Sequence, residues 1–171
     1  MMKKQLNSLQ MILIMVFFHS YWANGQITNP AYKVLLGTLY KNEVPLISCD
    51  SAQALAKAVF LDTRARPEYD VSHIPGARWV GYEEFSLPKV RDISFQTPVV
   101  VYCSVGVRSE RVGKKMREAG YTQVYNLNGS LFEWVNQDKP IVNAQGQPTQ
   151  KVHAYSPAWG IWLRKGQKVY E

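Results

Sequence analysis

Cys103 is the residue whose sequence surroundings most favour chemistry. It follows the β-branched residues 99–101 and precedes a helical segment that starts near Arg108, so it lies at the carboxyl end of a predicted buried strand, in a short loop that contains Gly106. The backbone N–H groups of such a loop point inward, and the helix amino terminus adds partial positive charge. Arg108 adds a full charge. A thiol in this position should ionise readily, and an anion should bind above it.

The chain contains one other cysteine, Cys49, so a Cys49–Cys103 disulfide is one alternative for an exported protein. A cysteine in an anion-binding loop is better explained as a reactive thiol. We therefore expect Cys49 to be an inert, partly buried thiol. Cysteine and histidine are not clustered at the spacing of metal ligands, and neither a metal nor a cofactor is expected.

Residues 1–25 have the pattern of a secretory signal peptide. Two lysines near the start precede an apolar run at residues 11–18, and the small residues Ala23 and Gly25 follow it. The run is shorter than the roughly 20 apolar residues that a membrane-spanning helix needs. We expect cleavage after Gly25, export to the periplasm or the extracellular space, and no stable membrane insertion afterwards. An uncleaved anchor is the alternative.

Composition indicates a globular protein with only a mild excess of positive charge. The 171 residues suit one domain with a hydrophobic core, and 46% of them are hydrophobic. The net charge of +7 falls to +5 without residues 1–25, which hold two lysines and no acidic residue. Basic runs never exceed two residues and do not interleave with aromatic residues, so nucleic acid is not an expected partner. The surplus favours small anions, or contributes only to solubility.

Apolar periodicity predicts strands that alternate with helices over about 100 residues. The predicted strands cover residues 44–47, 59–62, 78–80, 98–103 and 123–127. Pro45 favours an edge position for the first strand, and Ser130 with Glu133 predicts a capping box for the last helix. The alternation indicates an α/β sandwich with a mostly parallel sheet. Ligands bind such sheets at the carboxyl ends of strands, where Cys103 and Asp62 lie.

Two further segments flank this pattern. Residues 26–42 are predicted to form an N-terminal docking helix, capped by Asn29, whose apolar face packs onto the domain. Residues 141–171 contain an aromatic-rich stretch at 155–163 and are expected to pack back onto the domain as a C-terminal extension. A tail that binds a partner is the alternative.

Several stretches follow one another in a fixed order. They are Leu-Asp-Thr-Arg at 61–64 with Pro-Glu-Tyr at 67–69, His-Ile-Pro-Gly-Ala at 73–77, and Val-Tyr-Cys-Ser-Val-Gly-Val-Arg-Ser at 101–109. In this order and spacing, from about residue 44 to residue 134, the chain resembles the single-domain rhodanese-like sulfurtransferases. The resemblance implies a rhodanese-like three-layer sandwich over residues 43–140, with a mostly parallel central sheet flanked by helices.

The resemblance also implies transfer of a sulfane sulfur through Cys103. A small anionic donor, thiosulfate or a persulfide, would deliver the sulfur and leave a cysteine persulfide, and a thiol or cyanide would then accept it. The thiolate is the nucleophile, so the pKa of Cys103 must lie below the free value of about 8.5. The loop N–H groups, the helix end and Arg108 act in that direction, and the same groups would hold the outgoing anion.

The family's substrate loop maps onto Ser104, Val105, Gly106, Val107, Arg108 and Ser109. Residues 104–107 are expected to contribute mainly backbone, with Gly106 the residue that most needs unusual dihedral angles. Ser109 would either hydrogen-bond the thiolate or cap the helix.

Three residues outside the loop are expected to support it. Asp62 and Arg64 match the family's strand-end Asp-x-Arg and are interpreted as a salt-bridged pair that supports the loop without touching substrate. His73 lies in the family's turn and is interpreted as an oriented structural histidine, with base catalysis as the alternative.

Loop length argues against related cysteine enzymes. Cys103 to Arg108 reads Cys-x4-Arg, whereas cysteine phosphatases, including those that share this fold, have Cys-x5-Arg, because phosphate is larger than a single sulfur atom. A phosphatase or arsenate reductase is one alternative function, and a non-enzymatic rhodanese-like binding module is another. Two-domain members tuned to thiosulfate carry basic residues directly after the cysteine, whereas Ser104 and Val105 are neutral. The loop sequence therefore does not select between thiosulfate and a persulfide as the sulfur donor.

Overall fold

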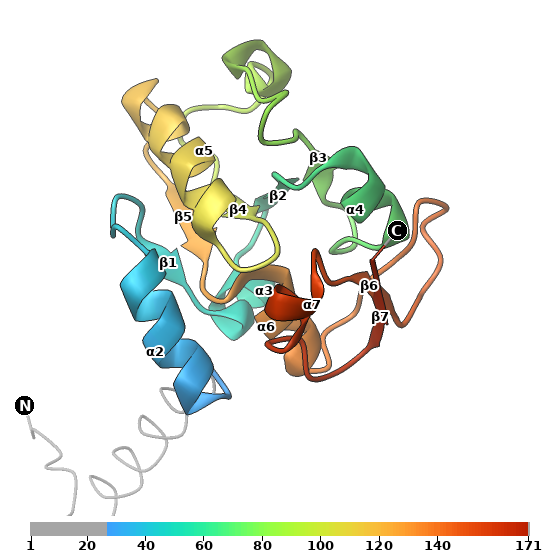
Figure 1. The fold of residues 1–171 in the computed structure, drawn as a ribbon. Coiled ribbons are helices and arrows are strands. Elements are labelled where there is room, and N and C mark those ends of the chain that lie inside the picture. The colour runs from blue at the N-terminus through green and yellow to red at the C-terminus, as the bar shows by residue number, and fades with distance from the viewer. Residues whose placement is uncertain (1–26, 171) are drawn as a thin grey trace, which may run out of the picture.

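A five-stranded parallel sheet forms the centre of the computed structural model, which describes residues 27–170 (Figure 1). The strands are β1 (Leu46–Ile47), β2 (Val59–Asp62), β3 (Arg78–Trp79), β4 (Val99–Tyr102) and β5 (Val124–Leu127). Their order is β1-β5-β4-β2-β3, and every neighbouring pair is parallel. β1 thus lies at the edge that Pro45 predicted. The predicted signal peptide, residues 1–25, lies outside the described residues.

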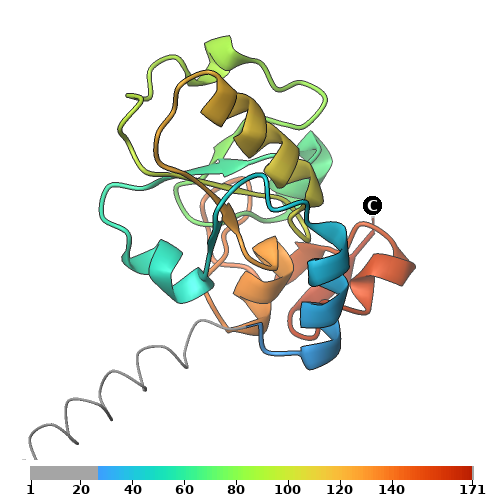
Figure 2. The same cartoon turned by 90° about the vertical axis from the view of Figure 1, so that its left-hand side faces the viewer.

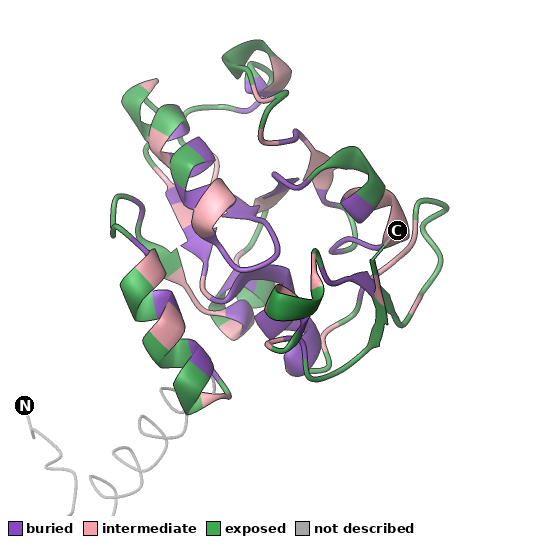
Figure 3. Cartoon of the chain, viewed as in Figure 1, coloured by how far each residue is buried: buried purple, intermediate pink, exposed green. Residues whose placement is uncertain are grey.

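The central strand β4 is buried on both of its faces (Figure 3). Successive side chains of a strand point to opposite faces of the sheet. Val99 and Val101 accordingly join one apolar cluster, whereas Val100 and Tyr102 join the other. A continuous run of β-branched residues suits a parallel strand that is covered on both faces. The strand ends one residue before Cys103 and delivers that residue to the carboxyl edge of the sheet.

Helices cover both faces of the sheet (Figure 2). They are α2 (Pro30–Leu39), α3 (Cys49–Ala54), α4 (Arg66–Val71), η1 (Leu87–Val90), α5 (Val107–Glu118), α6 (Ser130–Asn136) and α7 (Pro157–Gly160). α5 packs Val112 and Met116 into one cluster, and α3 and α6 pack Ala52 and Leu131 into the other. This arrangement confirms the predicted α/β sandwich with a parallel sheet between helices. Within residues 27–170, no helix combines the length and apolar character that crossing a bilayer requires.

Both flanking segments pack on the α3–α6 side of the sheet. Asn29 Oδ1 caps α2 by accepting from the backbone N–H of Ala31, and Tyr32 and Leu36 on the buried face of α2 join the core. Strands β6 (Lys151–His153) and β7 (Gln167–Val169) pair with each other in a second, two-stranded sheet. Trp162, between α7 and β7, stacks on Tyr32 with ring centroids 5.4 Å apart. Residues from the two ends of the described chain therefore share one core.

The predicted capping box at α6 is wrong. The residue before the helix is Gly129, so Ser130 lies inside the first turn with a φ of 55°. The Ser130 hydroxyl instead accepts a hydrogen bond from the backbone N–H of Cys103. Glu133 Oε1 accepts from the backbone N–H of Thr28 at 2.8 Å. Both side chains that a local cap would use therefore form hydrogen bonds with residues distant in the sequence.

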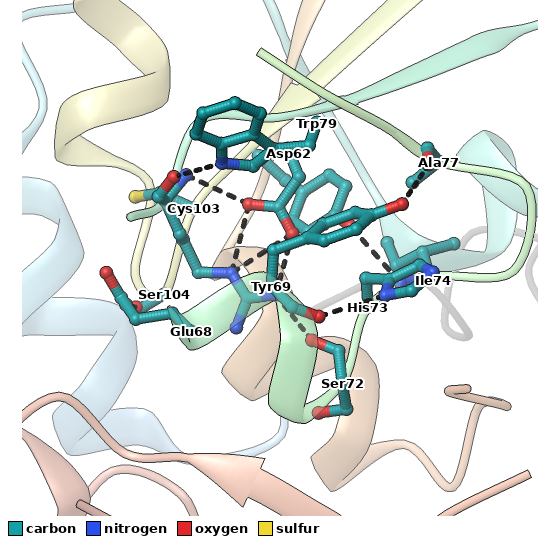
Figure 4. Close-up of polar contacts among 12 residues, drawn as sticks. Asp62, Glu68, Tyr69, Ser72, His73, Ile74, Ala77, Trp79, Cys103 and Ser104 are labelled. Atoms are coloured by element: carbon teal, nitrogen blue, oxygen red, sulfur yellow. Dashed lines mark hydrogen bonds and ion pairs between the residues drawn. The ribbon is translucent and has the colours of Figure 1, made fainter. Parts of the chain in front are cut away.

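A buried ion pair closes the carboxyl end of β2 (Figure 4). Asp62 Oδ2 lies 2.6 Å from Arg64 Nη2, and both side chains are fully buried. The same Nη2 donates to the carbonyl of Ser72 at the end of α4, and the indole N–H of Trp79 in β3 donates to the carbonyl of Arg64. Buried charges persist only when they are paired and hydrogen-bonded. The pair expected from the sequence is present, and it ties together β2, α4 and β3.

Candidate active site

Cys103 lies at the start of the loop between β4 and α5, and only 1% of its surface is exposed. Its backbone is held by the start of α6, because its N–H donates to Ser130 Oγ at 3.0 Å and its carbonyl accepts from the N–H of Leu131 at 3.1 Å. A second strand-to-helix junction, distant in sequence, therefore positions the thiol.

Gly106 gives the loop its curvature. Its φ of +107° is in the region that favours glycine, as the sequence predicted, and its N–H lies 3.0 Å from Cys103 Sγ. A Cβ at this position would overlap the hydroxyl of Tyr40. That hydroxyl donates to the carbonyl of Val105 at 2.7 Å and accepts from the N–H of Gly129 at 3.1 Å. Tyr40, the residue directly after α2, thus joins the loop to the start of α6.

The environment of Cys103 lowers the pKa of its thiol despite burial. Burial alone would raise the pKa, because it disfavours the charged thiolate. The positive charge of Arg108 and the backbone N–H groups of Ser109, Gly106 and Val105 oppose that effect and outweigh it. The thiol is therefore ionised at lower pH than a free cysteine, which is the property a nucleophile needs.

Glu68 binds the two charged or polar side chains of the loop, and its place in the site was missed from the sequence. Arg108 donates to both carboxylate oxygens of Glu68, at 2.7 and 2.9 Å, and the Ser104 hydroxyl donates to Oε1 at 3.0 Å. Arg108 also reaches Ser104 Oγ at 3.1 Å. The expectation that Ser104 contributes mainly backbone is wrong. The signals in the sequence were an acidic residue in the first turn of the helix that follows β2 and its place in the Pro-Glu-Tyr stretch of the resemblance.

Ser109 acts on the thiol through its backbone and not through its hydroxyl. The hydroxyl donates to Asn126 Oδ1 at 2.7 Å, and Asn126 Nδ2 donates to the carbonyl of Gly106 at 3.0 Å. Both roles proposed for the Ser109 side chain are therefore wrong. Asn126, in β5, therefore binds the Gly106 carbonyl, and the backbone N–H groups of the loop remain available to the thiolate.

Among the supporting residues, Arg64 approaches the loop through Tyr102, whereas His73 packs on Tyr69. The Arg64 guanidinium lies 5.9 Å from the centre of the Tyr102 ring, and Tyr102 directly precedes Cys103. His73 stacks on Tyr69 with ring centroids 3.8 Å apart, and its Nδ1 lies 3.0 Å from the Tyr69 carbonyl (Figure 4). These contacts fit the structural interpretation of Asp62, Arg64 and His73.

A cavity of about 220 Å³ opens above the thiol. Its lining residues are Leu39, Cys103, Ser104, Val105, Val107, Arg108, Tyr155 and Trp159. Leu39 ends α2, whereas Tyr155 and Trp159 belong to the C-terminal segment around α7. The sequence indicated that residues 155–163 pack on the domain, but nothing in it placed them over Cys103.

Cys49 takes no part in this site in the structure. It is a free, buried thiol in α3, and Cys103 is likewise free. Burial, with the nearby charge of Glu133, raises the pKa of the Cys49 thiol to about 12. It is therefore neutral and unreactive near neutral pH, and it is more deeply buried than expected.

A family model, described as the rhodanese-like domain, matches residues 48–137. The chain belongs to the rhodanese-like family. Among curated proteins it is similar to the uncharacterized protein YqhL of Bacillus subtilis, with 36% identity over 78 residues, or 46% of this chain and 61% of that protein. It is also similar to tRNA uridine(34) hydroxylase of Erwinia tasmaniensis, with 32% identity over 99 residues, or 55% of this chain and 27% of that protein. The chain thus spans 61% or less of the length of these relatives.

Solved structures show the same rhodanese-like fold. The thiosulfate sulfurtransferase from Pseudomonas aeruginosa aligns with a TM-score of 0.57 and 25% identity, covering 68% of this chain and 23% of that one. A rhodanese-related protein from Thermoplasma volcanium aligns with a TM-score of 0.52 and 18% identity, covering 57% of this chain and 97% of that one. The rhodanese-like match ends at residue 137, so Leu39, Tyr155 and Trp159 lie outside it.

We expect Gly106→Ala to destabilise the rhodanese-like loop more than glycine replacement at a left-handed position does by itself. Gly76 also has positive φ, +74°, but open space surrounds the position of its Cβ. Gly76→Ala should therefore show only backbone strain, about 1–2 kcal/mol. Gly106→Ala should lose about 1–3 kcal/mol more, because Tyr40 must also move. Urea unfolding of both variants measures the difference, and equal losses would contradict the role given to Tyr40.

We expect Arg108→Gln to raise the pKa of the Cys103 thiol. The substitution removes the positive charge that favours the thiolate and leaves Glu68 unbalanced beside the loop. Iodoacetamide alkylates the thiolate, so its rate with Cys103 should fall as the pH is lowered. The midpoint of that fall should lie at a higher pH in Arg108→Gln than in the wild type. Arg111→Gln, at an exposed arginine of the same helix, is the matched control and should leave the profile unchanged. A profile that does not move in Arg108→Gln would contradict this assignment.

The companion variant Glu68→Gln should shift the same profile in the opposite direction. It removes a negative charge that offsets Arg108, so the pKa of Cys103 should fall below the wild-type value. General damage to the loop would move both variants the same way, and such a result would count against the electrostatic account.

Proposed function

We propose that the chain is a sulfurtransferase that carries a sulfane sulfur as a persulfide on Cys103. The observation that carries this proposal is the loop geometry. A buried thiol with a lowered pKa lies 3.0 Å from the N–H of Gly106, at the start of a six-residue Cys-x4-Arg loop. Such a loop stabilises an anionic sulfur with backbone dipoles and leaves room for one added atom.

The transfer takes two displacement steps. The Cys103 thiolate attacks the outer sulfur of a donor such as thiosulfate, the S–S bond of the donor breaks, and its electron pair leaves with sulfite. The persulfide anion that remains accepts hydrogen bonds from the loop N–H groups. The thiolate of an acceptor, or cyanide, then attacks the outer sulfur of the persulfide, and the electron pair of that bond returns to Cys103.

The relatives support the proposal in part. The structural neighbour from Pseudomonas aeruginosa is named a thiosulfate sulfurtransferase and shares 25% identity. The tRNA uridine(34) hydroxylase of Erwinia tasmaniensis matches over only 27% of its length, so its activity carries no direct assignment. A phosphatase or arsenate reductase fits the short loop less well, and a non-enzymatic module would have no need of an activated thiol.

We expect wild-type protein incubated with thiosulfate or polysulfide to gain the mass of one sulfur atom on Cys103. Cys103→Ser should gain none, because it lacks the nucleophile. Cys49→Ser is the matched control and should gain the sulfur normally, since burial keeps that thiol neutral. Intact-protein and peptide mass spectrometry locate the adduct. If the wild type gains no sulfur from any donor, the proposal fails.

We also propose that the protein is exported. The support is the sequence pattern of residues 1–25, in which lysines precede an apolar run and small residues follow it. Expression with and without these residues, followed by amino-terminal sequencing of the exported fraction, tests the proposal. The mature chain should begin at Gln26. Exported protein that still begins at Met1, or retention of the full chain in the cytoplasm, would contradict it.

A further inference from the structure

Three of the eight residues that line the cavity above Cys103 come from segments outside the rhodanese-like match. Leu39 closes one side from the end of α2, and Tyr155 and Trp159 close another from the region of α7. Figure 1 shows α7 beside the loop that precedes α5, in agreement with this lining. With Val105 and Val107 of the loop, these residues give the 220 Å³ cavity a mainly apolar surface.

The positive charge of Arg108 at the cavity is already paired. Arg108 is the only cationic residue among those that line it, beside the Cys103 thiolate, and its guanidinium is bound to both carboxylate oxygens of Glu68. The centroid of the Tyr155 ring lies 5.2 Å from the Cζ atom of the same guanidinium. A dianion that entered this cavity would lose its hydration and meet no free cation, which is costly. A compound with less charge and an apolar group would lose less.

The two aromatic residues of the cavity wall, Tyr155 and Trp159, are held in place by the surrounding structure. Tyr155 adopts a φ of +65°, which is unfavourable for a non-glycine residue, and its N–H donates to His153 Nδ1 at 3.2 Å. Trp159 is half-buried and packs against the main apolar cluster. Backbone strain that the surrounding structure maintains is typical of functional sites.

We propose that this cavity binds the organic group of a sulfane-sulfur donor, an aromatic or branched aliphatic group next to the reacting sulfur, in preference to the inorganic dianion thiosulfate. The inference rests on the proposed sulfurtransferase function and specifies its substrate class. Leu39, Tyr155 and Trp159 contact the organic group, while the loop N–H groups hold the sulfur.

Benzenethiosulfonate and methanethiosulfonate are suitable probes because both are monoanions that differ only in the organic group. The Cys103 thiolate attacks the outer sulfur of either compound and forms the new S–S bond. The bond between that sulfur and the sulfonyl sulfur breaks, and its electron pair leaves with the sulfinate. Charge balances, since two monoanions give two monoanions, and no oxidant or reductant is needed.

The experiment measures kcat/KM for persulfide formation with the two thiosulfonates and with thiosulfate. Each value is divided by the rate of the same donor with free cysteine, which removes differences between leaving groups. In the wild type, benzenethiosulfonate should exceed methanethiosulfonate by roughly tenfold or more, the range that a buried apolar group provides. Thiosulfate should be the poorest of the three.

Variants assign the preference to the cavity. Trp159→Ala and Leu39→Ala should bring the benzene-to-methane ratio close to one, because each removes a wall. Phe95→Ala, at an exposed aromatic residue that does not line this cavity, should keep the wild-type ratio. The ratio compares two donors on the same preparation, so partial unfolding of a variant cancels.

The outcomes separate the two proposals. If no donor places sulfur on Cys103, the sulfurtransferase function itself fails. If sulfur is transferred but the wild-type ratio is near one, or the ratio survives both wall variants, or thiosulfate is the best donor, only the inference about the organic group is overturned.

Discussion

Burial opposes the ionisation of Cys103, and the structure around the thiol compensates for that opposition. A thiolate removed from water needs hydrogen bonds and positive charge close by. The loop supplies the backbone N–H groups of Val105, Gly106 and Ser109, and Arg108 supplies the charge. These N–H groups can point at the sulfur only because Gly106 has positive φ and because Tyr40 and Asn126 hold the loop carbonyls on the outside.

The ion pair between Arg108 and Glu68 sets how much charge the site presents. Arg108 alone would make the loop a general anion site. With Nη1 and Nη2 bound to a carboxylate, Arg108 still lowers the pKa of Cys103, but Glu68 offsets its positive charge. Ser104 is held by the same carboxylate. One buried acid therefore positions the loop and limits its attraction for small anions.

The rhodanese-like segment supplies the thiol, and the flanking segments complete its surroundings. Residues 48–137 contain the sheet from β2 to β5 and the loop at Cys103. The helix before this segment provides Tyr40 and Leu39, and the chain after it provides Tyr155 and Trp159. The two flanking segments also pack on each other where Tyr32 stacks on Trp162. The stability of the site and the shape of its cavity thus depend on residues that the family match does not include.

The sequence by itself determined the α/β fold, the strand that delivers Cys103 and the left-handed Gly106, because these follow from apolar periodicity and from the needs of a short loop. The buried pair of Asp62 and Arg64 joins residues two positions apart, and the family resemblance indicated it. Only the tertiary structure decided which side chains surround the thiol. Glu68 reaches Arg108 across 40 residues, Tyr40 reaches Val105 across 65, and Ser130 gives up its local cap for the N–H of Cys103. Such contacts leave no periodic trace in the sequence, because parallel strands bring distant segments together at one edge of the sheet.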